Sequence, residues 1–184
     1  MNGILKGVRP LDYVLAGLMT AAGAYLMYLN MIAADGPALA HPLSTTSWLI
    51  LPAFVLVTLP ILWRRRHILA VIGVTIAATA LHVLAFGWIT RCGVALPLSF
   101  ALAYAVARFA GSRANQLIGL AGIVVLELVV LVRDASIGEI PSGLVVALPI
   151  TAVFYGIGLV VQNQVSSRQS RSAAVAPVVE RTAA

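Results

Sequence analysis

The stretch that decides the fold lies near the middle of the chain, where residues 64–89 read RRRHILAVIGVTIAATALHVLAFGWI. Three arginines and a histidine open it, and the 22 residues that follow, 68–89, contain no acid, lysine or arginine. A transmembrane helix needs about 20 predominantly apolar residues, and arginines commonly mark its cytoplasmic boundary. Residues 68–89 are therefore predicted to cross a membrane as a helix.

Five further apolar runs lie on either side of this one. The six predicted spans are 11–33, 48–63, 68–89, 94–109, 116–132 and 143–162. They are too long for strands of a membrane barrel and lack the alternation that such strands require. A helix satisfies its own backbone hydrogen bonds in lipid. The predicted fold class is all-α: a polytopic membrane protein whose residues 1–162 form a bundle of six transmembrane helices with short loops.

The composition of the 184-residue chain agrees with a membrane protein, since 61% of it is hydrophobic and 10% is charged. Soluble domains carry about 25% charged residues. The net charge of +6 comes from basic residues at the ends of apolar runs, a placement that suits anionic headgroups and not nucleic acid. A single cysteine, Cys92, excludes an intramolecular disulfide and a multi-cysteine metal site.

Two alternatives concern the spans themselves. The runs 48–63 and 94–109 would cover only about 24 Å of a core roughly 30 Å thick, so a five-span protein with one re-entrant segment stays open. Residues 38–40, Ala-Leu-Ala, resemble a signal-peptidase site. The first run is longer than the 7–15 apolar residues of a signal peptide, which favours an uncleaved first helix.

The basic residues predict the orientation. With the N-terminus inside, ten of the 12 lysines and arginines lie in cytoplasmic segments and two, Arg91 and Arg133, lie outside. We expect a plasma-membrane protein with both termini cytoplasmic and residues 163–184 as a disordered cytoplasmic tail. The two longer outer loops, 34–47 and 133–142, could form a small outer cap.

Three polar residues in the outer halves of spans are candidates for an intramembrane site: Glu127, His82 and Asn30. Each lies in an odd-numbered span, and the span that follows it contains a proline. Either three related hairpins or chance would explain this pattern. Glu127 is the only acid well inside a span, so it should be protonated, paired or facing water. A proton shared between Glu127 and His82 could respond to external pH, whereas the alternative is two ordinary, satisfied polar side chains.

The cluster Arg64, Arg65 and Arg66 is predicted to contact anionic lipid headgroups and to set the inner boundary of two spans. Docking of a protein partner is the alternative. No zinc motif, nucleophile elbow or phosphate-binding loop occurs in the sequence, so we expect no catalytic residues, cofactor or metal.

Three segments carry a family resemblance: RPLD (9–12), LPILWRRR (59–66), and AYAVAR (103–108) at the end of a later span. Over residues 9–162 the chain resembles the membrane-spanning N-terminal region of actinobacterial two-component sensor histidine kinases. Such kinases continue into a dimerisation helix with the phosphorylated histidine and an ATP-binding domain, which these 184 residues lack. The resemblance implies a sensor-like membrane module without kinase activity.

The sequence thus predicts a non-enzymatic module that senses, scaffolds or regulates through a membrane or cytoplasmic signalling protein, or as a homodimer. A small transporter or channel using Glu127 and His82 is the second hypothesis. An intramembrane enzyme is the third, and it lacks a recognisable nucleophile or metal set.

Overall fold

The chain folds into a bundle of apolar helices. The computed structural model describes residues 7–33 and 39–182, with the side chains of the last helix as far as Arg168. The elements are α1 (Pro10–Ile32), α2 (Ile50–Thr58) with its 3-10 continuation η1 (Leu59–Trp63), α3 (Ile68–Phe86), α4 (Cys92–Phe109), α5 (Arg113–Val132) and α6 (Ile140–Thr182). Within the described ranges there is no strand, and the predicted all-α bundle is confirmed.

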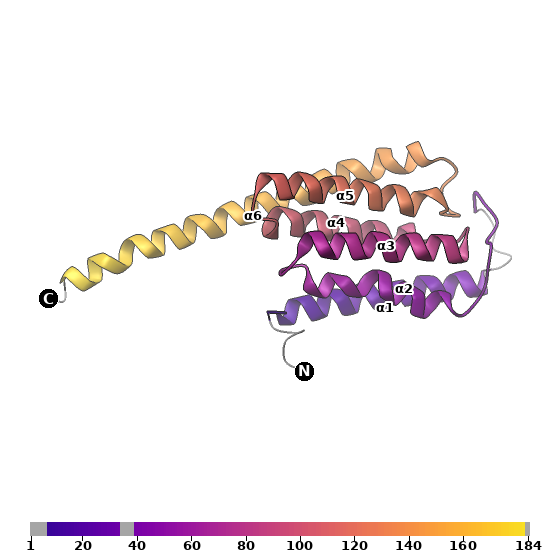
Figure 1. Ribbon diagram of the computed structural model, residues 1–184, viewed down its shortest axis with the longest axis horizontal. Helices are drawn as coiled ribbons and strands as arrows, with labels where there is room; N and C mark the ends of the chain where they lie inside the picture. Colours follow the sequence, from indigo (N-terminus) through magenta and orange to yellow (C-terminus); the bar gives the residue numbers. More distant parts are fainter. Residues whose placement is uncertain (1–6, 34–38, 183–184) are drawn as a thin grey trace.

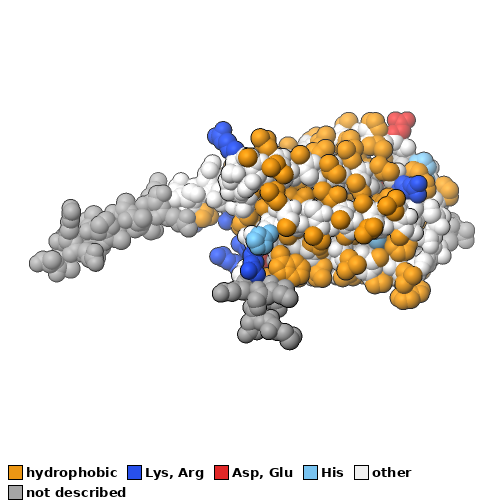
Figure 2. Space-filling model, viewed as in Figure 1, with side chains coloured by type: hydrophobic (Ala, Val, Ile, Leu, Met, Phe, Trp, Pro, Cys, Tyr) orange, Lys and Arg blue, Asp and Glu red, His pale blue; other side chains and the backbone are white. Residues whose placement is uncertain are grey.

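The outer surface of the bundle is apolar, as a lipid-facing surface must be. Large hydrophobic side chains remain exposed on most helices, among them Leu18 (61%), Leu84 (75%) and Val145 (74%). Figure 2 shows hydrophobic side chains over the middle of the bundle, with Lys and Arg towards its two ends. Such a continuous apolar surface is not tolerated by monomeric proteins in water. Within the described residues, five helices are long and apolar enough to cross a bilayer, so the chain is an integral, multi-pass membrane protein.

Helix α4 lies at the centre of the bundle. It packs against α1, α3, α5 and α6. Half of its residues are buried, a larger share than in the other long helices, and none of its large hydrophobic side chains is among the exposed ones. Side chains on α4 therefore face protein on most sides, and the surrounding helices pack against it.

We name the two ends of the bundle after an arginine at each. The Arg64 end holds the start of α1, the turns at 64–67 and 110–112, and the point where α6 leaves the bundle (Figure 1). The Arg91 end holds the connections 39–49, 87–91 and 133–139. The described parts of these three connections are joined by backbone hydrogen bonds, His41 to Ala135, Ser44 to Trp88 and Ala135 to Ile89. They form the small cap that the sequence predicted.

The second predicted span is a composite helix. Its α-helical part begins at Ile50, and the chain tightens into η1 at Leu59, next to Pro60, which has no N–H for an α-helical hydrogen bond. Nine α-helical and five 3-10 residues rise about 24 Å in total. Ser44 is bonded at the Arg91 end and Arg64 at the other, so the segment between them runs the length of the bundle and is not re-entrant.

The sixth helix is longer than expected. Residues 163–182, for which the sequence predicted a disordered tail, continue α6 to Thr182. A helix that is already nucleated extends readily through Ala, Gln and Arg, which favours this continuation, and the helix also runs through Pro177 near its end. Figure 1 shows this part of α6 projecting away from the bundle at the Arg64 end.

Candidate functional site

Glu127 lies where three helices meet. The side chain is on α5 and is fully buried. Its Oε1 accepts hydrogen bonds from Ser99 of α4, at 2.9 Å, and from Thr151 of α6. Its Oε2 is also buried and has no hydrogen-bond partner in the described part of the chain. One carboxyl group thus joins α4, α5 and α6 while half of its bonding capacity is unused.

Ser99 and Thr151 supply the hydrogen bonds of this carboxyl. Ser99 Oγ lies 2.9 Å from Glu127 Oε1 and 2.8 Å from the carbonyl oxygen of Leu96, and it has one hydrogen to share between them. No described cation forms an ion pair with Glu127. The carboxyl is therefore held by hydroxyl groups of two neighbouring helices and not by a counter-charge.

His82 is buried in a different place, towards the Arg91 end of α3. Its Nδ1 accepts a hydrogen bond from Nε of Arg91 at 3.2 Å, and its Nε2 lies 3.4 Å from the carbonyl oxygen of Ile50. Because Nδ1 accepts, the hydrogen sits on Nε2 and the imidazole is neutral. The rings of Phe54 and Phe86 pack on either side, with centroids 5.2 and 4.8 Å away.

Arg91 is the largest fully buried side chain of the described chain, although the sequence predicted it to lie in a connection outside the spans. Its guanidinium donates to the carbonyl oxygens of Arg133 at 2.7 Å and Gly87 at 2.8 Å, besides the bond to His82. Burial lowers the pKa of Arg91 to about 10, an effect that the nearby Asp134 carboxylate opposes. The group therefore stays charged at neutral pH and holds two connections together.

Asn30 reaches the same connection from α1. Its Oδ1 accepts from the backbone N–H and the hydroxyl of Thr90 at 2.9 and 2.8 Å, and its Nδ2 donates to the Thr90 carbonyl at 3.0 Å. Asn30 and His82 thus both hold residues 87–91, whereas Glu127 belongs to a separate cluster. Glu127 and His82 form no hydrogen bond with each other in the described structure: His82 bonds to Arg91, and Glu127 bonds to Ser99 and Thr151.

At the Arg64 end, an aspartate in the first turn of α1 organises the arginine cluster. Asp12 is fully buried and forms ion pairs with Arg64 at 2.9 Å and Arg65 at 2.7 Å. It also accepts the backbone N–H of Arg9 at 2.9 Å. Arg64 and Arg65, two of the three arginines predicted to contact lipid headgroups, are therefore ion-paired with Asp12. The side chain of Arg66 is exposed and makes an interaction of its own.

The sequence contains a signal for these buried charged residues, but the same residues also serve as indicators of membrane orientation. Asp12 lies directly inside the first span, and Arg91 and Asp134 each border a span, so charges of opposite sign flank neighbouring apolar runs. Counting them only as orientation signals overlooked that they could pair. Ser99 and Thr151, the partners of Glu127, carry no such signal, because hydroxyl groups are common in transmembrane helices.

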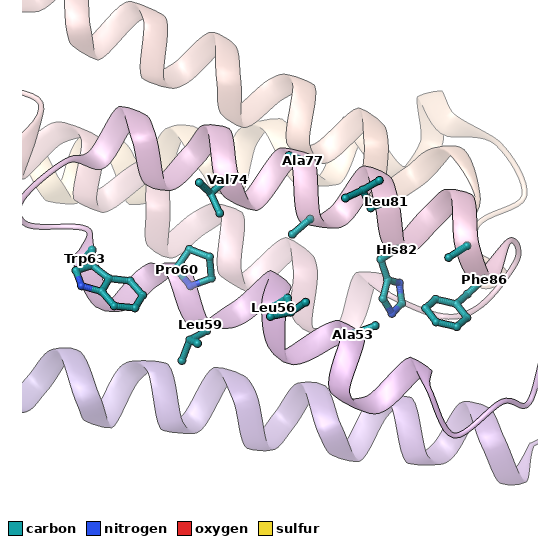
Figure 3. A pocket seen from close by; sticks show the side chains of 12 residues that line it. Ala53, Leu56, Leu59, Pro60, Trp63, Val74, Ala77, Leu81, His82 and Phe86 are labelled. Atoms are coloured by element: carbon teal, nitrogen blue, oxygen red, sulfur yellow. The ribbon is translucent and has the colours of Figure 1, made fainter. Parts of the chain in front are cut away.

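An apolar groove of about 600 Å³ runs along the outside of the bundle between α2–η1 and α3. Figure 3 shows the side chains of both elements along it, Leu56, Leu59 and Pro60 on one side and Val74, Ala77 and Leu81 on the other. Trp63 lies near one end, and His82 and Phe86 lie near the other. The groove therefore spans most of the bundle and is open to the surrounding lipid.

No group of three or more His, Cys, Asp or Glu side chains within the described ranges is arranged to hold a metal ion. Comparison of the chain with family models, curated proteins and solved structures gives no match. The candidate sites are therefore judged on their geometry. They are the buried carboxyl of Glu127 between three helices, a cluster of buried charged side chains at each end of the bundle, and the lipid-facing groove.

Proposed function

We propose that the chain is a non-enzymatic, sensor-like membrane module that passes a change in its transmembrane bundle to a partner protein through α6. The observation that supports this most directly is the path of α6, a single helix that packs within the bundle and continues beyond it at the Arg64 end (Figure 1). A helix is stiff along its axis, so a tilt or rotation inside the membrane is carried to its far end. The resemblance to the membrane regions of sensor kinases supports the same function.

Among the contacts that couple α6 to the rest of the bundle, two are especially direct. Thr151 bonds to Glu127, so a change at that carboxyl acts directly on α6. Farther along, a Cβ on Gly158 would lie 2.8 Å from the carbonyl oxygen of Tyr104 and 2.6 Å from the Cβ of Ala107. The backbones of α4 and α6 are therefore in close contact there. A small shift of α6 would change its packing against α4.

We also propose that the module lies in the plasma membrane with the Arg64 end cytoplasmic, because ten of the 12 basic residues would then lie inside. Reporter fusions after Thr46 and Ser136 should give external signals. Fusions after Arg65, Asn115 and Ala184 should give cytoplasmic ones. An external signal at Ala184 or a cytoplasmic one at Ser136 would contradict this topology.

The coupling itself is tested by distance measurement between spin labels at Ala114, at the start of α5, and Ser167, on α6, in a Cys92→Ser background. Glu127→Ala should shift or broaden the distance distribution, because it removes the bond to Thr151. Glu139→Ala, an exposed acid at the Arg91 end, serves as the control and should leave it unchanged. Identical distributions in wild type and Glu127→Ala would refute transmission through α6.

One observation favours a second function, a proton-conducting transporter or channel: Oε2 of Glu127 is buried without a partner. Such an oxygen is available to a passing proton or cation. Proteoliposomes with an enclosed pH dye would then acidify under a proton gradient, and Glu127→Gln would abolish the flux. Absence of flux in the wild type would leave the sensor-like module as the better account.

A further inference from the structure

The apolar groove between α2–η1 and α3 is the middle part of a longer surface feature. A second hollow of about 560 Å³ adjoins it towards the Arg64 end and shares Pro60, Trp63 and Val74 with it. A third, of about 360 Å³, shares Arg66 and His67 with the second. Arg66 and His67 thus border both a polar hollow at the Arg64 end and the apolar hollow next to the groove. We call these neighbouring hollows together the path, and its polar part at Arg66 and His67 the mouth.

The mouth of this path carries cationic and hydrogen-bonding groups. Arg66 and His67 are both exposed, and Asn115 at the start of α5 lines the same hollow. A guanidinium donates in a planar fork that matches two phosphate oxygens, and an imidazole N–H adds a third donor. The mouth therefore suits a phosphate group.

The body of the path has the length of one acyl chain in its leaflet. From His67 to Ala77, α3 rises about 15 Å, which is half of a hydrocarbon core roughly 30 Å thick. Along this length the walls are apolar, with Leu59 and Pro60 on one side and Val74 and Ala77 on the other. Several residues that α3 contributes to the path are alanines, and their small side chains leave room for an acyl chain.

A second copy of this chain in the same orientation fits the mouth less well, because the described side chains offer no matching acid. Of the four acids whose side chains the structure describes, Asp12 is bound to Arg64 and Arg65, and Glu127 is buried inside the bundle. The other two, Asp134 and Glu139, lie at the Arg91 end. Glu180 belongs to the last turn of α6, in the part of that helix that projects away from the bundle (Figure 1). Charge complementarity at Arg66 therefore favours a phosphate from the bilayer.

We propose that this path is a binding site for one anionic phospholipid, with its phosphate at Arg66 and His67 and an acyl chain laid along α3 as far as Ala77. The site is independent of the function proposed for α6 and Glu127. Asp12 draws Arg64 and Arg65 into the protein, and Arg66 lines the mouth. The occupant also fills a hollow beside η1, where the backbone departs from a regular α-helix.

The experiment is native mass spectrometry of the full chain, released from mild detergent with added phosphatidylglycerol or with phosphatidylcholine of the same acyl chains. Wild type should retain one phosphatidylglycerol at concentrations where phosphatidylcholine is lost. Arg66→Gln should weaken retention about tenfold or more, as for the loss of a charge-assisted phosphate contact. Arg113→Gln, an exposed arginine at the same end, is the charge control and should change retention by less than about threefold.

The groove is tested separately with Ala77→Leu, which fills it from an exposed position and so should not disturb folding. It should abolish retention, whereas Ala121→Leu, on the exposed face of α5, should not. Equal retention of both lipids, or equal effects of Ala77→Leu and Ala121→Leu, would overturn the proposal. So would a dimer that carries no lipid and is lost in Ala77→Leu, since the occupant would then be a second copy.

Discussion

Asp134 accepts the backbone N–H of Arg91 at 2.6 Å, although the two residues lie 43 positions apart in different connections. The same carboxylate oxygen accepts the N–H of Cys92 at 2.6 Å, so Asp134 caps the start of α4 from outside the helix. In return, the guanidinium of Arg91 donates to the carbonyl oxygen of Arg133. The two connections therefore hold each other in both directions, and the central helix is anchored at this end.

Replacing Asp134 with Ala should lower the free energy of unfolding by about 3 kcal/mol or more, because it removes a helix cap and leaves a buried arginine without its counter-charge. Thermal unfolding followed by circular dichroism in detergent measures the loss. Glu139→Ala, on the same connection but exposed, is the matched control and should stay near wild type. Equal melting temperatures for the two variants would show that Asp134 does not stabilise this end of the bundle.

Arg91→Lys should also destabilise the protein, even though the charge is kept. A lysine ammonium cannot span the carbonyl oxygens of Arg133 and Gly87 and the imidazole of His82, which the planar guanidinium reaches together. The unsatisfied carbonyl groups would cost about 1–3 kcal/mol. Arg133→Lys, whose side chain is exposed, provides the comparison and should melt within a few degrees of wild type.

Replacing Glu127 with Ala should destabilise the bundle, because it leaves both Ser99 and Thr151 without this partner. Glu127→Gln keeps a side-chain oxygen that can accept from Thr151, so its melting temperature should stay closer to wild type. Thermal unfolding in detergent compares the two variants. A melting temperature of Glu127→Ala equal to that of wild type would show that these hydrogen bonds do not hold α4, α5 and α6 together.

Asp12→Asn should destabilise the Arg64 end by about 3–5 kcal/mol, because Arg64 and Arg65 would be left near the bundle interior without their counter-charge. Arg66→Gln is the control within the same cluster. Its side chain is exposed, so the melting temperature should change little even though lipid retention falls. If Asp12→Asn and Arg66→Gln were equally stable, the three arginines would be equivalent, as the sequence alone had indicated.

Much of the fold was predictable because insertion into lipid depends on properties that add up along the chain. The run 68–89 and the spans around it were recognised from apolar length alone, and four of the six helices begin and end within three residues of the prediction. The ends that differ have local causes: Pro60 turns the end of the second span into a 3-10 helix, and α6 keeps extending past its apolar part.

The site was only partly predictable. Glu127, His82 and Asn30 were recognised as buried polar residues because a polar group inside an apolar run needs a partner. Which partner each one takes depends on how far every helix is rotated about its axis, and hydropathy carries little information on rotation when a helix is apolar all round. That is why the sequence could indicate that both residues are buried but left open whether Glu127 and His82 pair with each other or with separate partners.

The sequence by itself determined that this chain crosses a membrane several times as helices, since the free energy of placing a segment in lipid follows from its own composition. Only the tertiary structure decided that Asp12 binds Arg64, that Asp134 caps α4 beside Arg91, and that Glu127 joins three helices. Those contacts connect residues that are distant in the chain, and their energy depends on distance and direction between side chains. Neither quantity exists until the helices have packed.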